Sequence, residues 1–367
     1  MSEWLSGNLG DIADIVMGQS PTGESVNTNG LGVPLLNGPT EFTIRYPKAV
    51  QFSTDPKRFS KVNDILFCVR GSTTGRMNWA DEDYAIGRGL AAIRHKQGEE
   101  YRYFVKAILD YYLDTMLASA SGSTFPNVSK DQLNELEISY PSFPEQKAIA
   151  SVLSSLDDKI DLLHRQNKTL EAMAETLFRQ WFIEEAKEDW ENGVLEQLID
   201  LKYGKALKQE DRSGSGYPVV ASSGIVGFHK EYLVEGPGIV IGRKGTLGKV
   251  YFMEGNFYPI DTSYFIQTKT SGSNLIFEYY LLKSLDFANM NSDSAVPGLN
   301  RNIALGTQIQ IPPVELILNF NETVQPWFSK IHSNTKQIQT LENLRDTLLP
   351  KLMSGEVRVQ YQTEEVA

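Results

Sequence analysis

The 367-residue sequence contains a single cysteine, Cys68. One cysteine can form no internal disulfide and cannot supply a cysteine-based zinc site, and such usage is typical of a reducing cytoplasm. The sequence also lacks an apolar run long enough to span a bilayer. Its first residues, MSEWLSGNLGDIAD, lack the basic and then apolar pattern of a signal peptide. We therefore expect a cytoplasmic chain without a membrane partner.

Motifs of several enzyme classes are missing as well. The sequence has no Asn/Asp-Pro-Pro-Tyr/Phe tetrapeptide, no GxGxxG after a strand, no Walker loop and no HExxH. Its four histidines show no metal-ligand spacing. Acidic residues cluster at Asp81, Glu82 and Asp83, but without the Pro-Asp…Glu-x-Lys layout of many nucleases. We expect a chain that is not itself an enzyme and that has no catalytic residue, metal or cofactor of its own.

Basic residues are in the minority, with 35 Lys and Arg against 46 Asp and Glu and a formal net charge of -11. This balance disfavours binding of nucleic acid by bulk charge alone. The excess of acidic residues is unevenly distributed along the chain. Residues 145–189 hold ten acidic and six basic residues, whereas residues 194–272 hold eight acidic and nine basic residues. The composition, 41% hydrophobic and 22% charged, is that of a folded protein, and the length suffices for two domains.

A long helix is predicted near the middle of the chain, from Pro144 to Phe182. Apolar residues recur there with a period of 3.5 over five heptads, and nine of the ten a and d positions are apolar. Such a narrow seam is typical of a helix that packs against another helix. The predicted seam comprises Ile149, Leu153, Leu156, Ile160, Leu163, Asn167, Leu170, Leu177 and Trp181.

The same pattern returns 171 residues later, and its register holds without a gap over about 60 residues. Upstream, STFPNVSKDQLNELEISYP (123–141) overlays SAVPGLNRNIALGTQIQIP (294–312), with proline on proline twice. This is an internal duplication. We expect Pro326, inside the second pattern, to kink that helix or to mark its start. The second seam comprises Val324, Trp327, Ile331, Asn334, Ile338, Leu341, Leu348 and Leu352.

Two complementary seams in one chain predict that the two helices pack together as an antiparallel coiled coil. A domain-sized segment rich in glycine, aromatic and β-branched residues precedes each helix. We therefore expect an α+β fold in which two mixed α/β domains are separated by two long helices, with a pseudo-two-fold internal repeat. The expected segments are domain 1 (1–143), the central helix (144–189), domain 2 (190–313), the C-terminal helix (314–356) and a tail (357–367).

A basic turn recurs in the two domains. DILFCVRGSTTGRM (64–77) resembles GIVIGRKGTLGKV (238–250), and both contain Arg-x-x-Thr-x-Gly followed by a basic residue. Such a turn can hold a phosphate through backbone N–H groups and arginine, or it can simply need glycine for hairpin geometry. Candidate nucleic-acid contacts are Arg70, Ser72, Thr73, Arg76, Lys130, Arg243, Lys244, Thr246, Lys249 and Arg301. Weaker candidates are Tyr84, Arg88, Lys205, Lys208 and Lys230.

Three segments carry a resemblance to a known family. PSFPEQKAIASVLSSLDDKIDLLHRQNKTLEAMAETLFRQWF (141–182) resembles the central conserved region of type I restriction–modification specificity subunits. TLLPKLMSGEVRV (347–359) resembles the end of their C-terminal conserved region, and residues 123–141 resemble the closing segment of their target recognition domains. With the duplicated layout, the resemblance covers essentially the whole chain. One departure is PPVEL (312–316) in place of FPEQ (143–146), at the predicted start of the second helix.

The resemblance implies that each recognition domain reads one half of a bipartite, asymmetric site in double-stranded DNA, while the paired helices set the spacing. It also implies two modification subunits that dock on the helices and methylate adenine with S-adenosylmethionine, and restriction subunits that use ATP and Mg. The low net charge leads us to expect weak DNA binding by the isolated chain. A self-contained restriction or modification enzyme, and a coiled-coil adaptor that does not read DNA, are the alternative interpretations.

Overall fold

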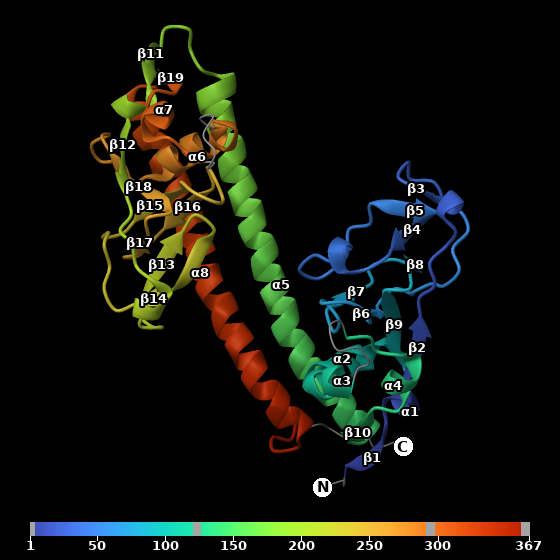
Figure 1. The fold of residues 1–367 in the computed structure, drawn as a ribbon. Helices are drawn as coiled ribbons and strands as arrows, with labels where there is room; N and C mark the ends of the chain where they lie inside the picture. The colour runs from blue at the N-terminus through green and yellow to red at the C-terminus, as the bar shows by residue number, and fades with distance from the viewer. Residues whose placement is uncertain (1–3, 120–125, 291–297, 361–367) are drawn as a thin grey trace. The chain divides into compact units, whose positions relative to one another are not determined.

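The computed structural model describes residues 4–119, 126–290 and 298–360. The chain divides into two compact units, one of residues 1–164 with 335–367 and the other of residues 165–334. Each unit combines one globular domain with parts of two long helices, α5 (Phe143–Arg179) and α8 (Val314–Met353) (Figure 1). Within the described residues, no helix has the length and apolar character needed to cross a bilayer.

The domain of the first unit is built on short strands and helices. Its strands are β1 (Leu5–Asn8), β2 (Ala13–Met17), β3 (Val26–Asn27), β4 (Val33–Leu36), β5 (Gln51–Ser53), β6 (Ile65–Cys68), β7 (Met77–Trp79), β8 (Ala85–Ile86), β9 (Leu90–His95) and β10 (Glu137–Tyr140). Its helices are α1 (Leu9–Ile12), α2 (Arg102–Tyr111), α3 (Leu113–Ser119) and α4 (Lys130–Asn134). The strands form two four-stranded sheets, in the orders β2-β9-β6-β7 and β3-β5-β4-β8, and β1 pairs with β10.

The domain of the second unit repeats this plan. Its strands are β11 (Glu191–Val194), β12 (Ile199–Tyr203), β13 (Tyr217–Ala221), β14 (Gly224–His229), β15 (Gly238–Gly242), β16 (Val250–Met253), β17 (Tyr258–Pro259), β18 (Ser263–Thr268) and β19 (Gln308–Ile311). Its helices are α6 (Ile276–Ser284) and α7 (Arg301–Leu305). The sheets have the orders β12-β18-β15-β16 and β14-β13-β17, and β11 pairs with β19.

The two domains therefore share one strand order, apart from β3, which has no counterpart among the described strands of the second unit. The parallel pair β4–β8 corresponds to the parallel pair β13–β17, and the other strands of these sheets run antiparallel. Even the helix caps correspond, because Ser129 before α4 and Asn300 before α7 are 171 residues apart. Each of these side chains accepts a hydrogen bond from a backbone N–H of the first helical turn, which stabilises the helix start.

The ends of the long helices lie within a few residues of those expected. α5 begins at Phe143 and ends in a π-helical turn, Gln180–Glu184. α8 begins at Val314 and continues through Pro326, so the expectation that Pro326 could mark its start is wrong. Pro326 lies on an exposed face of the helix, where water can satisfy the carbonyl that has lost its N–H partner.

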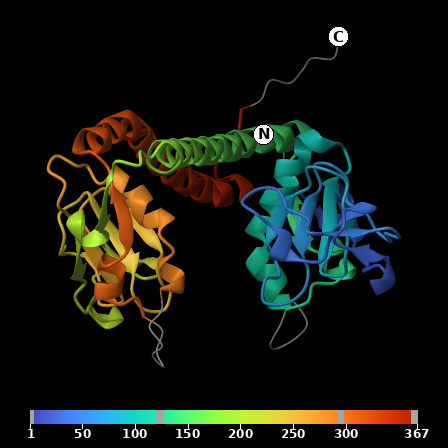
Figure 2. The ribbon, with the colours of Figure 1, turned by 90° about the horizontal axis from the view of Figure 1, so that it is seen from above.

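Parts of α5 and α8 lie side by side within each unit (Figure 2). In the first unit, Ile160 and Leu163 pack against Ile338, with Leu341 beside them. In the second unit, Asn334 donates a hydrogen bond of 2.8 Å to the side-chain oxygen of Asn167. The asparagine of each predicted seam therefore pairs with that of the other, and such a buried pair fixes the register of helices in coiled coils.

At both ends of the predicted seam, residues of the helices also pack in the domain cores. Ile149, Leu153 and Leu352 belong to the core of the first domain, and Val324 belongs to the core of the second. The physical reason is that each domain packs its own apolar core against the nearest helix ends. The remaining seam residues are buried or half-buried, namely Leu156, Leu170, Leu177, Trp181, Trp327, Ile331 and Leu348.

Candidate nucleic-acid interface

The two Arg-x-x-Thr-x-Gly turns connect antiparallel strands, β6 and β7 in the first unit and β15 and β16 in the second. Gly75 and Gly248 have φ angles of 92° and 69°. A Cβ atom on Gly75 would lie 2.5 Å from a methyl carbon of Leu113, and one on Gly248 would lie 2.6 Å from the Cβ atom of Phe287. Hairpin geometry therefore explains these two glycines, and the functional interpretation must rest on the exposed side chains around them.

Each turn is tied to the closing segment of its own domain. In the first unit, the N–H group of Gly71 donates to the carbonyl oxygen of Pro126 at 3.2 Å, and that of Val128 donates to Val69 at 3.0 Å. In the second unit, the N–H group of Leu299 donates to the carbonyl oxygen of Arg243 at 2.9 Å. Because the segment leads into α4 or α7, the turn and the start of that helix have a fixed relationship.

The first unit exposes most of the predicted contacts. Thr73 is half-buried, and its hydroxyl oxygen lies 3.5 Å from the sulfur of Cys68. Tyr84 is buried, with 2% exposure, and its hydroxyl group donates to Asp81 at 2.7 Å, which identifies Tyr84 as a packing residue. The exposed candidates are Arg70, Ser72, Arg76, Arg88 and Lys130.

Arg243 and Arg301 in the second unit are engaged with the protein itself. The Arg243 guanidinium lies 4.9 Å from the ring centroid of Tyr203 and donates to the carbonyl oxygen of Asp261 at 2.9 Å. The Arg301 guanidinium pairs with Asp200 and donates through Nε to Leu201. Both arginines therefore support the fold. The exposed candidates are Lys205, Lys208, Lys230, Lys244, Thr246 and Lys249.

The Asp200 carboxylate accepts hydrogen bonds from two basic side chains of the second unit. Hydrogen bonds from Lys202 and Arg301 lower the pKa of Asp200 below its ordinary value. The carboxylate therefore stays ionised and holds Arg301 beside the sheet. An arginine used in this way is a weaker candidate for DNA contact than the exposed lysines.

An open groove of about 590 Å³ lies beside the turn of the second unit. Sequence reasoning had singled out only Lys244 among its lining residues. The others come from strands β13 and β14, the turn between them, and segments around Gln209 and Ile260 that are distant in the sequence, so no single sequence pattern marks them. The polar side chains that line it belong to Gln209, Arg212, Ser222, Ser223, Lys244 and Thr262.

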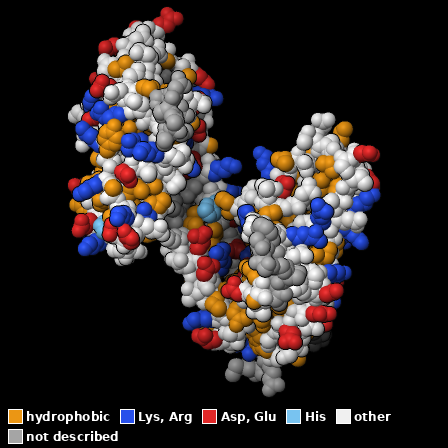
Figure 3. Space-filling view, viewed as in Figure 1, with side chains coloured by type: hydrophobic (Ala, Val, Ile, Leu, Met, Phe, Trp, Pro, Cys, Tyr) orange, Lys and Arg blue, Asp and Glu red, His pale blue; other side chains and the backbone are white. Residues whose placement is uncertain are grey.

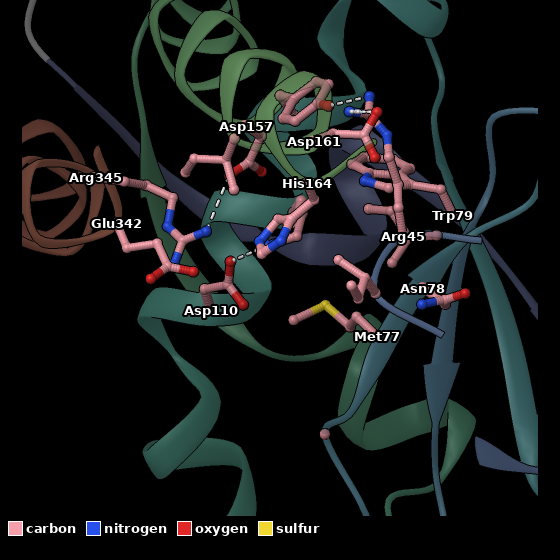
Figure 4. A pocket seen from close by; sticks show the side chains of 16 residues that line it. Arg45, Met77, Asn78, Trp79, Asp110, Asp157, Asp161, His164, Glu342 and Arg345 are labelled. Atoms are coloured by element: carbon pink, nitrogen blue, oxygen red, sulfur yellow. Dashed lines mark hydrogen bonds and ion pairs between the residues drawn. The ribbon is translucent and has the colours of Figure 1, made fainter. Parts of the chain in front are cut away.

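A second cavity, of about 340 Å³, lies in the first unit between the domain and the helices (Figure 4). Its charged groups are largely paired with one another. Arg345 pairs with Asp157 at 3.0 Å, and Lys106 pairs with Asp110 at 2.7 Å. Four carboxylates line this cavity, which makes it unsuitable for phosphate. The four are Asp110, Asp157, Asp161 and Glu342.

Figure 3 shows lysine and arginine side chains interspersed with acidic and hydrophobic ones over each unit. This mixture agrees with the near balance of charge in residues 194–272. Recognition of DNA by either unit would therefore depend on particular side chains more than on a broad basic face.

Comparisons with known proteins agree on one family. A family model described as type I restriction modification DNA specificity domain matches residues 1–172 and again residues 187–343. The specificity subunit of the type I restriction enzyme MjaIX from Methanocaldococcus jannaschii is 26% identical over 98% of this chain and 94% of that protein. A putative type I specificity subunit from Mycoplasma genitalium is 26% identical, over 80% of this chain and 82% of that protein.

A solved structure shows the same fold. The crystal structure of the S subunit of a type I restriction–modification system from M. genitalium matches with a TM-score of 0.68. The match covers 99% of this chain and 97% of that one, at 23% sequence identity. This chain therefore shares the fold of that protein.

Proposed function

This chain belongs to the type I restriction–modification DNA specificity family, and we propose on that premise that each of its two domains reads one half of a split DNA site. The observation that carries the proposal is the repeated scaffold with altered side chains. Arg70, Thr73 and Gly75 recur as Arg243, Thr246 and Gly248, whereas the residues between them differ. One scaffold with unlike exposed side chains is what two readers of unlike half-sites need.

The long helices act in this proposal as an antiparallel coiled coil that sets the spacing between the half-sites. α5 has 37 residues and is therefore about 55 Å long. The hydrogen bond between Asn167 and Asn334 supports a defined register between the helices. A shift by one heptad would separate these two amides and leave a polar group facing apolar side chains, which is costly.

Two modification subunits bind the helices in this proposal and supply the methyl transfer to adenine with S-adenosylmethionine. Restriction subunits that use ATP and Mg would join the same complex, and this chain would carry no catalytic step. A shallow apolar groove beside Trp327, lined by Ala172, Met173 and Thr176, supports a protein-binding role for the helices. Met173 is 45% exposed and contributes apolar surface to this groove.

The decisive experiment is methylation sequencing of DNA from cells that express this chain with its cognate modification subunit. We expect a split motif with methylated adenine and two unlike halves. Replacing residues 1–143 by the corresponding segment of a relative should then change one half and leave the other intact. Assembly of the complex without any split motif would contradict the proposal and favour an adaptor that does not read DNA.

A further inference from the structure

We propose that the open groove in the second unit is a base-reading surface for one half-site, with Gln209, Ser223 and Lys244 as its specificity-determining side chains. This inference rests on the proposed function, because it names the residues with which one domain would read DNA. The groove lies beside the basic turn that follows β15 and is formed entirely by residues of the second unit.

The charge of the groove suits a nucleic acid. Arg212 and Lys244 line it, and none of its lining residues carries a carboxylate. This is a notable local balance in a chain with a formal net charge of -11. The cavity of the first unit differs in this respect, because four carboxylates line it. Phosphate groups and electronegative base edges would therefore be attracted to the groove of the second unit.

The floor of the groove is held in place by the protein. Arg212 donates through Nη1 to the carbonyl oxygen of Val226 at 2.9 Å, and its buried Nε atom has no hydrogen-bond partner among the described residues. The backbone N–H group of Ser222 donates to Thr262, and the Ser222 carbonyl accepts from Tyr251 at 3.2 Å. A fixed floor limits the conformational entropy lost on binding.

The rim of the groove offers the chemistry needed to distinguish bases. Gln209, Ser223 and Lys244 are exposed there. A glutamine amide has both donor and acceptor groups and can form two hydrogen bonds with adenine in the major groove. A serine hydroxyl can serve as donor or acceptor, and a lysine can donate to guanine or to phosphate.

The first unit does not carry this set of side chains. The parallel strand pairs align the two domains. Val219 pairs with the first residue of β17, and Leu35 pairs with the first residue of β8, so Val219 corresponds to Leu35. In this alignment Ser222 and Ser223 correspond to Gly38 and Pro39. The two Arg-x-x-Thr-x-Gly turns align Arg70 with Arg243, so Gly71 of the first unit corresponds to Lys244 of the second. The two domains would thus read unlike sequences, as a split asymmetric site requires.

The test uses the full chain assembled with its modification subunit, and the variants Gln209→Ala, Ser223→Ala and Lys244→Ala. We expect Gln209→Ala and Ser223→Ala to relax the methylated motif at positions within one half only. Discrimination at a relaxed position should fall roughly 5- to 100-fold, in line with the value of a base-specific contact. Lys244→Ala should weaken binding to a duplex containing the motif and reduce its salt dependence.

Matched controls are available in the same unit. Gln310→Ala and Lys187→Ala remove an exposed glutamine and an exposed lysine that do not line the groove. Both controls should leave the motif and the affinity unchanged, and unaltered thermal unfolding of all five variants would show that folding is not the cause.

The outcomes separate the two proposals. A split motif that is the same in the wild type and in all three groove variants, with unchanged affinity, would overturn the groove inference and leave the proposed function standing. Loss of recognition at positions in both halves would also overturn it, since the groove belongs to one unit. Absence of any split motif for the wild type would instead contradict the proposed function.

Discussion

The two units join their domains to the same pair of helices by different chemistry. In the second unit, aromatic rings meet at the junction, and the centroids of Phe182 and Phe277 are 4.7 Å apart. Phe320 packs within 5.3 Å of Phe182. In the first unit, the apolar contacts that Ile149, Leu153 and Leu352 make with the domain are joined by ion pairs, including Asp157 with Arg345. The duplicated secondary structure has therefore been kept, while some of the side-chain contacts between each domain and the helices differ.

Corresponding positions in the two copies of the long helix carry different types of side chain. Asp157 on α5 corresponds to Phe328 on α8, and Arg345 on α8 corresponds to Ala174 on α5, at the spacing of 171 residues. The ring of Phe328 packs against Phe252 at 5.1 Å. Burial of an aromatic ring stabilises a junction directly, whereas an ion pair gains less because both charges lose water. We expect the second junction to be the more stable of the two.

The largest expected effect is on the aromatic junction. Phe320→Ala should destabilise the second unit by about 4 kcal/mol, because Phe320 is fully buried and its removal leaves a cavity among several rings. Hydrogen exchange measured by mass spectrometry, with peptides assigned to each unit, would report the change where it occurs. Leu344→Ala, on an exposed part of α8, is the control and should cost less than about 0.5 kcal/mol. Equal losses of stability in Phe320→Ala and Leu344→Ala would contradict the claim that the aromatic junction stabilises the second unit.

A smaller but substantial effect is expected at the ion pair between Arg358 and Glu145, which joins the end of the described chain to the start of α5. Both guanidinium nitrogens of the fork contact the carboxylate, whose side chain is only 1% exposed. Arg358→Met should destabilise the first unit by about 3 kcal/mol, since a buried charge is left without its partner. Urea unfolding would measure this change.

The second unit suggests how to rescue that variant. Glu145 corresponds to Leu316 at the start of α8. The double variant Glu145→Leu/Arg358→Met should therefore recover most of the lost stability, because an apolar pair of similar size can replace a buried ion pair. If the double variant were as unstable as Arg358→Met, an apolar pair could not replace the ion pair at this position.

The smallest expected effect is a pH dependence confined to the first unit. Burial lowers the pKa of His95 below its ordinary value, although a hydrogen bond with Gln146 and the charge of Glu100 oppose the shift. Nε2 of His95 lies 3.1 Å from the side-chain oxygen of Gln146, and Tyr101 stacks on the ring at 4.6 Å. The corresponding residue in the second unit is Thr268, which does not titrate.

The direction of this dependence follows from the lowered pKa. Below the ordinary histidine pKa of about 6.5, the unfolded chain binds a proton that the folded unit resists. The contribution of His95 to the free energy of unfolding is therefore constant above that pH, and the folded unit becomes less stable as the pH decreases below it. His95→Gln should flatten this part of the profile, measured by urea unfolding between pH 7.5 and 5.5. Identical slopes for the variant and the wild type would contradict the assignment.

The sequence by itself determined the repeat, the two long helices and the two domains of one plan. These features depend on local periodicity and on a register of 171 residues, both of which can be read without tertiary contacts. The basic turns were also identified correctly as turns. Their glycines, however, proved to be needed for backbone geometry at Gly75 and Gly248.

Only the tertiary structure decided which side chains meet. The residues of the groove come from strands and turns that are distant in the sequence, and Glu145 and Arg358 are 213 positions apart in the chain. It also showed that Arg301 is held by Asp200 and that Asn167 faces Asn334. The physical reason is that a helical or strand period constrains which face of an element is buried, whereas the partner on that face depends on how distant segments pack.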